Sequence, residues 1–435
     1  MSFDSPSFWW FVIAVWCACQ LIRHNAARKM LLLAASYLVY SSFFPAGSKL
    51  IYALLLAGVT AGSFAAGRTA NRGLLIAGVW IAAGGLAAAK GWLSPLPVGL
   101  SFYLLQAIAW MMESYRSAKP GGENFLDFAL YMSFFPRLTA GPIVRAEEFL
   151  PQLAKRTLVE SAALWEGVVL IVFGLFKKLA LADNLGLAVD PVFADLHLHH
   201  GASPSRILLA TYGFAAQIYC DFSGYSDMAL GTARLFGYRL PENFNWPYLA
   251  RNPADFWRRW HISLSNWLRD YVYFSLPGHR AKSRVPMYLN LLATMAICGL
   301  WHGYRWTYLL WGIYHGFLLV LHHTSKRLNS VLLMQQLAVA GWILFRAERV
   351  SDLAAYSASL MSGPFFTGFG EAEWLALVIL GAVVLFHAIQ ARVPVTKAML
   401  THRWNPWTCT ALLVLALVTA ALSVPQQQMF LYFWF

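Results

Sequence analysis

Two histidines in an otherwise apolar sequence carry side chains that could move protons. His302 lies in the segment Leu300–Gly303, at the end of a hydrophobic stretch, and His261 lies among the tryptophans and arginines of Asp255–Leu268. An ionisable residue inside a membrane is costly and usually functional. The pair therefore points to proton transfer in a membrane. A buried histidine that packs helices, or one that caps a helix or snorkels, remains the alternative at each position.

The residues that lead to His302 predict one wall of a cavity. Polar side chains recur at every fourth position of an apolar helix, so they share one face of it. Trp301 can shield such a site, and Gly303 lets a second backbone approach closely. A neutral imidazole there could take a proton from a hydroxyl that attacks a thioester, a form of general-base catalysis worth about 10²–10⁴-fold in rate. The residues of this polar stripe are Asn290, Thr294, Cys298 and His302.

The composition places both histidines in an integral membrane protein. The 435 residues are 59% hydrophobic and 12% charged, whereas a soluble domain carries roughly 25% charged residues. Apolar runs long enough to cross a bilayer predict an all-α polytopic membrane protein with about 11–12 spans. These runs lie near 8–22, 30–45, 50–66, 73–89, 96–114, 161–181, 206–222, 286–303, 305–322, 330–346, 373–391 and 405–424.

Basic residues mark alternate connections and set the predicted orientation. The net charge is +13, and Lys and Arg cluster after the first, third, fifth and ninth spans. Because cytoplasmic loops carry an excess of Lys and Arg, both termini are expected outside and 238–285 inside. The same placement explains the charge without a nucleic-acid partner. The segment Met1–Pro6 has no basic residue, so the first span is predicted to be a retained helix and not a signal peptide.

Three segments interrupt the apolar pattern. Residues 120–160 are punctuated by Gly and Pro and predict broken helices or a re-entrant loop, which a membrane tolerates only inside protein. Residues 184–205 should form the largest outer loop, and their histidines lack the carboxylate or cysteine pattern of a metal site. Residues 238–285 are too charged to span, because the six charges between 251 and 270 would cost on the order of 15–20 kcal/mol.

An amphipathic helix is predicted within this charged segment. At 100° per residue its apolar and polar side chains separate into two arcs, as in helices that lie along a membrane interface. His261 falls at the edge of the apolar arc, directed toward the membrane. The apolar arc holds Trp257, Trp260, Leu264, Trp267 and Leu268, and the polar arc holds Arg258, Arg259, Ser265 and Asn266.

Other polar residues near membrane depth have structural explanations. Asp221 and Asp227 need partners, for which Arg258 or Arg259 are candidates, and an ion pair or a helix break is favoured over a pair of catalytic carboxylates. Lys178 and its neighbouring lysine, near the end of the sixth span, are expected to snorkel. The five cysteines show no paired metal-ligand spacing, so apolar packing is their expected role.

Six blocks of this sequence resemble successive motifs of the membrane-bound O-acyltransferase (MBOAT) family. The two that contain His261 and His302 are together highly specific. The bacterial alginate O-acetylation branch is the most similar, because Gly341–Ala347 and Phe430–Phe433 also resemble it. The resemblance covers nearly the whole chain. The six blocks are Val98–Tyr103, Phe134–Arg145, Gly174–Lys178 with Ala182–Asn184, Asp221–Asp227, Arg251–Ser265 and Gly299–Gly303.

The resemblance implies one integral-membrane acyltransferase domain over 1–435, in which re-entrant and interfacial helices form a central funnel or tunnel. Its expected parts are N-terminal helices (1–120), a re-entrant region (120–160), a catalytic core (161–346) and C-terminal helices (373–435). It implies His302 as the main catalytic histidine and His261 as the second. The residues expected to bind donor or substrate are Arg258, Arg259, Trp301, Ser263, Ser265 and Asn252, and those expected in support are Asp221, Asp227 and Cys298.

The function implied is transfer of an acyl group, most simply acetyl, across a bacterial inner membrane to an exported polysaccharide such as alginate. Acetyl-CoA or another acyl thioester would be the co-substrate, with no bound cofactor or metal, and Arg and Lys of 251–284 would favour its phosphates. A periplasmic partner would dock near the aromatic C-terminal tail, in which five of the last six residues are aromatic. The alternatives are D-alanyl transfer to teichoic acid and a polysaccharide or lipid transporter, which should show inverted repeats.

Overall fold

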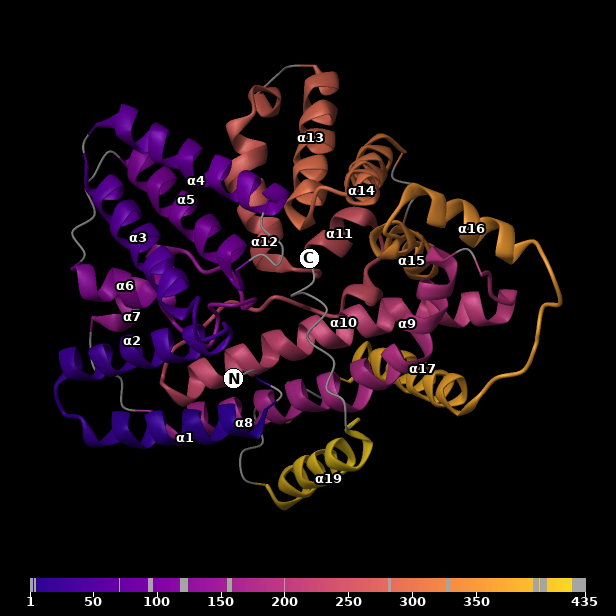
Figure 1. The fold of residues 1–435 in the computed structure, drawn as a ribbon, viewed down its shortest axis with the longest axis horizontal. Helices are drawn as coiled ribbons and strands as arrows, with labels where there is room; N and C mark the ends of the chain where they lie inside the picture. Colours follow the sequence, from indigo (N-terminus) through magenta and orange to yellow (C-terminus); the bar gives the residue numbers. More distant parts are fainter. Residues whose placement is uncertain are drawn as a thin grey trace. The chain divides into compact units, whose positions relative to one another are not determined.

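The computed structural model describes most of the chain and divides it into two compact units. The first unit is Met1–Ile171 with Tyr225–Glu242, and the second is Val172–Gly224 with Asn243–Phe435. All regular elements of the described residues are helical (Figure 1). The described residues are 3, 5–69, 71–92, 97–117, 124–154, 159–198, 200–280, 283–325, 329–393, 399 and 405–424.

The first unit contains the N-terminal helices. In it α3, α4 and α5 pack side by side (Figure 1), and the indole of Trp110 donates a hydrogen bond to the carbonyl oxygen of Ser63 at 3.1 Å. An ion pair of 2.5 Å between Lys29 and Asp127 ties α2 to α6. The helices are α1 (Pro6–Leu21), α2 (Asn25–Ser42), α3 (Lys49–Arg68), α4 (Arg72–Trp92), α5 (Leu100–Ser117), α6 (Phe125–Ser133), α7 (Ala146–Leu153) and most of α8 (Ser161–Leu175).

The second unit contains both histidines of interest. It includes the first part of α10 (Pro204–Leu235), whose last turns belong to the first unit. Its other helices are the π-helical η1 (Phe176–Ala182), α9 (Asp183–His197), η2 (Pro247–Leu249), α11 (Pro253–Trp257), α12 (Ile262–Trp267), η3 (Leu268–Val272), η4 (Tyr273–Ser275), η5 (Pro277–Arg280), α13 (Arg284–His302), α14 (Trp306–Ser325), α15 (Val331–Arg346), α16 (Val350–Leu360), α17 (Glu371–Gln390) and α19 (Pro406–Leu422).

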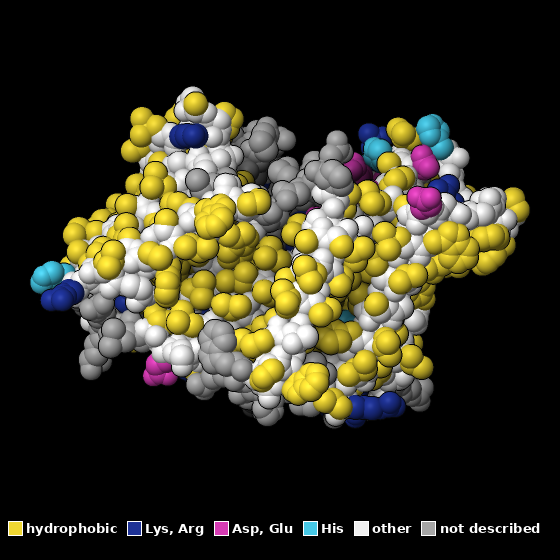
Figure 2. All heavy atoms as spheres, turned by 90° about the horizontal axis from the view of Figure 1, so that it is seen from below, with side chains coloured by type: hydrophobic (Ala, Val, Ile, Leu, Met, Phe, Trp, Pro, Cys, Tyr) yellow, Lys and Arg dark blue, Asp and Glu magenta, His cyan; other side chains and the backbone are white. Residues whose placement is uncertain are grey.

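The predicted apolar spans lie largely in helices, although 161–181 is divided between α8 and η1 and 206–222 is only part of α10. By length and composition, four described helices could cross a bilayer, namely α3, α4, α13 and α17, and α1, α15 and α19 are shorter apolar helices. Hydrophobic side chains spread over much of the face seen in Figure 2, and most of its charged side chains lie toward the edges. A soluble monomer rarely exposes so much contiguous apolar surface, so the fold is that of a multi-pass membrane protein.

The interrupted segment 120–160 forms broken helices, as predicted. Helices α6 and α7 are separated by residues 134–145, which form no helix. This linker is buried: Phe135 donates its backbone N–H to the hydroxyl of Ser36 at 3.1 Å, and Arg137 is 1% exposed. Packing inside the protein therefore supplies the hydrogen bonds that non-helical backbone needs at membrane depth.

Two predictions for the polar segments were wrong. Residues 184–205 are not an outer loop, because α9 continues through most of them to His197. Nor does 251–270 form one amphipathic helix. It breaks into α11 and α12, and His261 between them has a φ of +42°. The two arcs are nevertheless visible in the burial, since Trp260, Leu264, Trp267 and Leu268 are buried and Arg258 is exposed.

Candidate active site

His302 ends α13 inside a cluster of aromatic rings. Its side chain is buried, at 7% exposure. Its ring centroid lies 4.9 Å from that of Trp301, 5.3 Å from that of Trp311 and 5.0 Å from that of Phe345. These rings come from α13, α14 and α15. An imidazole so enclosed is shielded from bulk water, as general-base chemistry on a thioester requires.

Close packing of α13 against α14 positions His302. A Cβ added at Gly299 would collide with the carbonyl oxygen of Tyr308, and one added at Gly312 would collide with that of Met295. Such small residues allow backbones to approach closely in membrane helix pairs. The predicted polar stripe is buried along its whole length: Asn290, Thr294, Cys298 and His302 are each at most 7% exposed. The polar stripe therefore faces the protein interior, and Thr294 lines a cavity; a cavity wall formed by all four residues stays a prediction.

Asn243 holds His261 in place. Its Nδ1 lies 3.1 Å from Oδ1 of Asn243, and the same Oδ1 accepts hydrogen bonds from the backbone N–H of Ser263 at 3.2 Å and from its hydroxyl at 2.9 Å. A backbone N–H can only donate, so the facing amide atom of Asn243 is the oxygen. Nδ1 of His261 must then be the protonated nitrogen, and the neutral ring carries its lone pair on Nε2.

Burial keeps the His261 ring neutral. The side chain is 2% exposed and its ring packs edge-on against Phe222, with centroids 4.7 Å apart. Burial lowers the pKa of His261 to about 3, because a charged ring would lose its hydration. The ring is therefore buried in the protein, and its predicted direction toward the membrane stays a prediction.

Trp301 lies between the two histidines. Its ring centroid is 6.2 Å from that of His261 and 4.9 Å from that of His302. The rings of the two histidines, separated in sequence, thus both pack near one indole. This juxtaposition is the geometric core of the candidate active site.

A third buried histidine escaped the sequence analysis. His315 on α14 is 1% exposed, and its ring lies 5.1 Å from that of Trp311 and 5.2 Å from that of Trp257. Neither ring nitrogen has a hydrogen-bond partner among the described residues. The rule that singled out His302, an ionisable residue within an apolar span, applies equally to His315 and could have found it.

Several predicted binding residues have local structural partners. Asn252 caps α11 by accepting the backbone N–H of Asp255 at 2.8 Å. Arg259 pairs with Asp255 at 3.0 Å. The side chain of Arg258 is 70% exposed, with Asp255 at 3.9 Å, so it is the more accessible of the two arginines. Ser263 belongs to the Asn243 anchor of His261.

A small cavity of about 200 Å³ lies beside this cluster, on the side of the charged segment. Trp257, which contacts His315, forms part of its wall, and so does Ser265, whose hydroxyl donates to the carbonyl oxygen of Trp260 at 3.1 Å. Thr294 of the polar stripe also lines it. Thr294 and His302 are eight positions apart on α13, about 12 Å at 1.5 Å per residue. The stripe thus leads from this cavity to His302.

The predicted partners of Asp221 were wrong. Asp221 pairs with Lys178 at 2.9 Å, and Lys178 also pairs with Asp183 at 2.8 Å. Lys178 is 1% exposed, so it does not snorkel. The preference for a structural ion pair over catalytic carboxylates fits this triad. Asp227 is half-buried in the first unit, and no group of three or more His, Cys, Asp or Glu among the described residues could hold a metal ion.

Comparison with known proteins places these residues in a family context. The sequence profile of the membrane-bound O-acyltransferase family matches residues 34–351, which include both histidines. The aromatic block Phe430–Phe433 and the tail around it lie outside the described residues, so its docking role stays a prediction.

The chain is 36% identical over 396 residues to a probable alginate O-acetylase AlgI of Pseudomonas fluorescens, covering 85% of this chain and 76% of the relative. It is 36% identical over 296 residues to a peptidoglycan O-acetyltransferase of Helicobacter pylori, covering 59% and 55%. It is 28% identical over 248 residues to a teichoic acid D-alanyltransferase of Bacillus subtilis, covering 54% and 60%. Matches to further alginate O-acetylases span 49–56% of their lengths.

Proposed function

Because this chain belongs to the membrane-bound O-acyltransferase family, we propose that it carries an acetyl group from a cytoplasmic thioester to hydroxyl groups of an exported polysaccharide. The observation that carries this proposal is the packing of both His261 and His302 near the ring of Trp301. Two similar proteins are named as O-acetyl-transferring enzymes of alginate and peptidoglycan, both of which are exported glycans.

His302 is the proposed general base. It takes the proton of the acceptor hydroxyl as the oxygen attacks the thioester carbonyl carbon. The new C–O bond forms, the C–S bond breaks, and the departing thiolate receives the proton. The aromatic rings around His302 exclude water, which protects the thioester from hydrolysis. His261, neutral and oriented by Asn243, positions the donor or relays a proton from its Nε2 side.

The donor is proposed to enter from the charged segment. The cavity beside Trp257 and Thr294 offers space for the acyl end of a thioester. The exposed guanidinium of Arg258 is suited to the phosphates of acetyl-CoA, since Arg forms strong charge-assisted hydrogen bonds to phosphate. Arg259 is held by Asp255 and serves better as a support of this segment than as a ligand.

The proposed orientation has both termini on the periplasmic side of a bacterial inner membrane. The positive-inside rule then puts three connections, those around 197, 304 and 348, on the outer side. Contacts among them support this common side: Thr307 donates to the carbonyl oxygen of Ala347 at 2.8 Å, and His197 lies 3.0 Å from Asp352. His302 would then stand at the outer end of α13, where an exported acceptor arrives, aided by a periplasmic partner protein.

D-alanyl transfer is a second candidate, favoured by the match to a teichoic acid D-alanyltransferase. Its donor would be a carrier-protein thioester, and the same histidines would act. The greater identity and coverage of the O-acetylase match support the acetyl proposal. Membership of an enzyme family argues against the transporter alternative.

The test is substitution of His302 by alanine in cells that make the polymer. His302→Ala should lower polymer acetylation by about 10²-fold or more while the protein stays inserted and abundant. His323→Ala is a matched control, because His323 is an exposed histidine of α14. Acetylation near the wild-type level in a normally expressed His302→Ala protein would exclude His302 as the general base.

The donor is tested with oriented membrane vesicles and radiolabelled acetyl-CoA. Label should reach the polysaccharide only when acetyl-CoA is on the face that was cytoplasmic. Labelling from the opposite face would contradict the proposed orientation. Labelling from a D-alanyl carrier protein in place of acetyl-CoA would favour the second candidate.

A further inference from the structure

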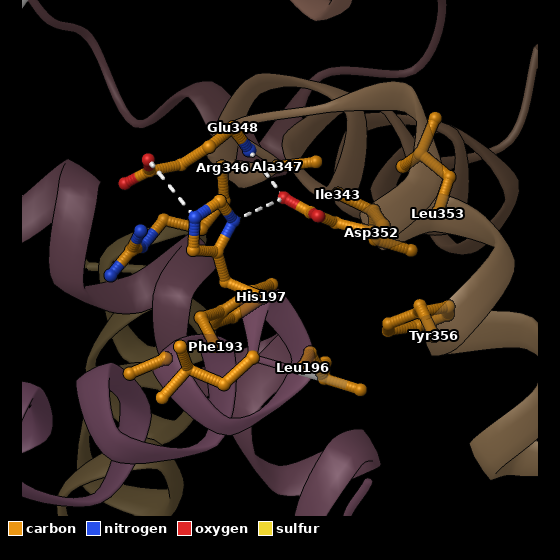
Figure 3. A pocket seen from close by; sticks show the side chains of 12 residues that line it. Phe193, Leu196, His197, Ile343, Arg346, Ala347, Glu348, Asp352, Leu353 and Tyr356 are labelled. Carbon is orange, nitrogen blue, oxygen red and sulfur yellow. Dashed lines mark hydrogen bonds and ion pairs between the residues drawn. The ribbon is translucent and has the colours of Figure 1, made fainter. Parts of the chain in front are cut away.

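A second cavity in the same unit has no role in the chemistry described so far. Its volume is about 270 Å³, and it lies among the end of α9, the end of α15 and the start of α16 (Figure 3). Its walls are mixed: Phe193 and Tyr356 contribute aromatic rings, and His197, Arg346, Glu348 and Asp352 contribute hydrogen-bonding groups. Small-molecule sites are concave, with a largely apolar wall and a few fixed polar groups, and typically fill about 300–1,000 Å³. This cavity is slightly smaller than that range.

His197 is oriented by a carboxylate whose own position is fixed. Oδ2 of Asp352 lies 3.0 Å from Nδ1 of His197 and accepts the backbone N–H groups of Arg349 at 2.9 Å and Glu348 at 3.0 Å. Burial raises the pKa of Asp352, but the hydrogen bond from His197 and those from the backbone lower it by more, so the net pKa lies below its ordinary value. An ionised Asp352 can only accept, so Nδ1 of His197 is the donor.

The other nitrogen of His197 is therefore the acceptor in the neutral ring. Nε2 lies 3.9 Å from Oε2 of Glu348, which is too long for a hydrogen bond. The imidazole stands between the two carboxylates, as Figure 3 shows. A histidine held on one side by a carboxylate presents the lone pair of its other nitrogen, and in His197 that nitrogen faces Glu348.

Arg346 gives the cavity a rigid cationic wall. Its guanidinium lies 3.2 Å from Asp190 and stacks over the ring of Phe193, with 5.1 Å from Cζ to the centroid. Its Nε is buried and has no hydrogen-bond partner among the described residues. The side chain as a whole is 21% exposed, so the accessible part of the guanidinium can donate to a ligand oxygen in the cavity.

The cavity adjoins the active site through one turn of α15. Phe345 packs on the ring of His302 at 5.0 Å, and the next two residues, Arg346 and Ala347, line the cavity. Thr307, shortly after His302, donates to the carbonyl oxygen of Ala347 at 2.8 Å. Consecutive residues of α15 thus contact His302 and line the cavity.

We propose that this cavity is the acceptor subsite and binds one hydroxyl-bearing sugar unit of the polysaccharide. Nε2 of His197 and the carboxylate of Glu348 accept hydrogen bonds from sugar hydroxyls, Arg346 donates to a sugar oxygen, and Phe193 and Tyr356 pack against the ring. The volume fits one sugar unit better than a folded segment of protein. The assignment of the bound sugar as the acyl acceptor rests on the proposed function. Binding of a sugar to the cavity does not depend on the acyl donor.

The test measures binding and turnover separately. Purified full-length protein in detergent is titrated with a de-O-acetylated alginate oligosaccharide, and in parallel with a peptidoglycan glycan fragment, while binding is followed by calorimetry. We expect one of the two probes to bind the wild type, and His197→Ala and Glu348→Gln to weaken its binding at least tenfold. His200→Ala is the matched control, because His200 is 67% exposed on the side chain and does not line the cavity. It should bind as the wild type does.

Steady-state kinetics then separate an acceptor site from a structural contact. With acetyl-CoA as donor, His197→Ala should raise the KM for the binding oligosaccharide at least tenfold and lower kcat by less than threefold. If neither probe binds the wild type, or if the probe that binds the wild type binds His197→Ala equally well, the acceptor subsite is elsewhere. If KM stays constant and kcat and the unfolding temperature fall together, His197 only ties α9 to α16. If the oligosaccharide binds as expected but no acetyl group is transferred, the proposed donor fails and the sugar site stands.

Discussion

Asn243 and His261 form the anchor on which the second histidine of the site depends. One oxygen of Asn243 faces the ring of His261 at 3.1 Å and also receives the backbone and the hydroxyl of Ser263. The backbone of Asn243 also contacts this segment, since its carbonyl oxygen accepts a hydrogen bond from the backbone N–H of Ile262 at 2.9 Å. The tautomer and the direction of the imidazole therefore follow from a residue eighteen positions earlier.

Replacement of Asn243 should lower both the stability of the protein and its acyl-transfer activity, because this side chain orients His261. Asn243→Ala leaves the backbone N–H of Ser263 and Nδ1 of His261 without their acceptor, which costs about 1–3 kcal/mol. We expect a lower unfolding temperature and acyl transfer reduced about tenfold or more. Asn243→Asp keeps the accepting oxygen and should retain more activity than Asn243→Ala. Equal activity of the two variants would remove the anchoring role.

The stability of the protein should fall in mild acid, because the buried ring of His261 resists protonation in the folded state. The pKa of this group is about 3 in the folded protein and about 6.5 when unfolded. Between these values the unfolded state binds the extra proton, so stability is lost as the pH falls below 6.5. At pH 5 the loss is about 2 kcal/mol, from 1.36 kcal/mol per pH unit. Thermal unfolding of the wild type should thus be more pH-dependent between 7.5 and 5 than that of His261→Gln. If the unfolding temperatures of the wild type and of His261→Gln change equally with pH, the ring of His261 is hydrated in the folded protein.

The triad around Lys178 should be sensitive to the loss of one charge. Lys178→Met leaves Asp183 and Asp221 buried without their cation, and breaking a buried ion pair costs about 3–5 kcal/mol. We expect a strong fall in unfolding temperature or in expression. Removing all three charges, with Asp183→Asn and Asp221→Asn added, should restore most of the stability. Lys177→Met, at the half-buried neighbour, is the control. A triple variant no better than Lys178→Met would indicate a role beyond charge balance.

Helix packing at Gly299 should be as important as the histidine it supports. In Gly299→Ala the added Cβ meets the carbonyl oxygen of Tyr308, so α13 and α14 must separate and His302 must move. We expect acyl transfer to fall at least tenfold, together with the unfolding temperature. Gly84→Ala is the control, since Gly84 in α4 has open space around its Cα and alanine is the better helix former. Unchanged activity and unfolding temperature in Gly299→Ala would show that α13 and α14 can accommodate the added methyl group without moving His302.

The sequence predicted the helices and the two main histidines because both signals are local. Apolar runs mark spans whatever their neighbours are, and a histidine in such a run is conspicuous. The break between α11 and α12 was not predictable, because the hydrophobic period of 251–268 continues through it. Its cause is the distant Asn243, which replaces the helical hydrogen bonds of residues 262 and 263.

The predictions failed most often for interactions between residues that are distant in sequence. Lys178 was expected to reach the interface because two adjacent lysines near a span end usually do, and only the fold brings Asp183 and Asp221 to it. The pairing of His197 with Asp352 spans 155 positions and leaves no pattern in the sequence. The family resemblance helped with the residues in motifs and did not reach these pairs.

The left-handed backbone of His261 has a consequence for how this site tolerates change. A φ of +42° costs a residue with a Cβ about 1–2 kcal/mol relative to glycine. Glycine at 261 would relax the turn between α11 and α12 and at the same time delete the imidazole. The imidazole is 2% exposed and contacts Asn243, so its removal would leave a buried cavity that costs about 2–5 kcal/mol, more than the strain relieved. A library screened for thermostability alone should therefore keep a side chain of similar size at position 261, and the strained turn persists because the ring fills the space beside it.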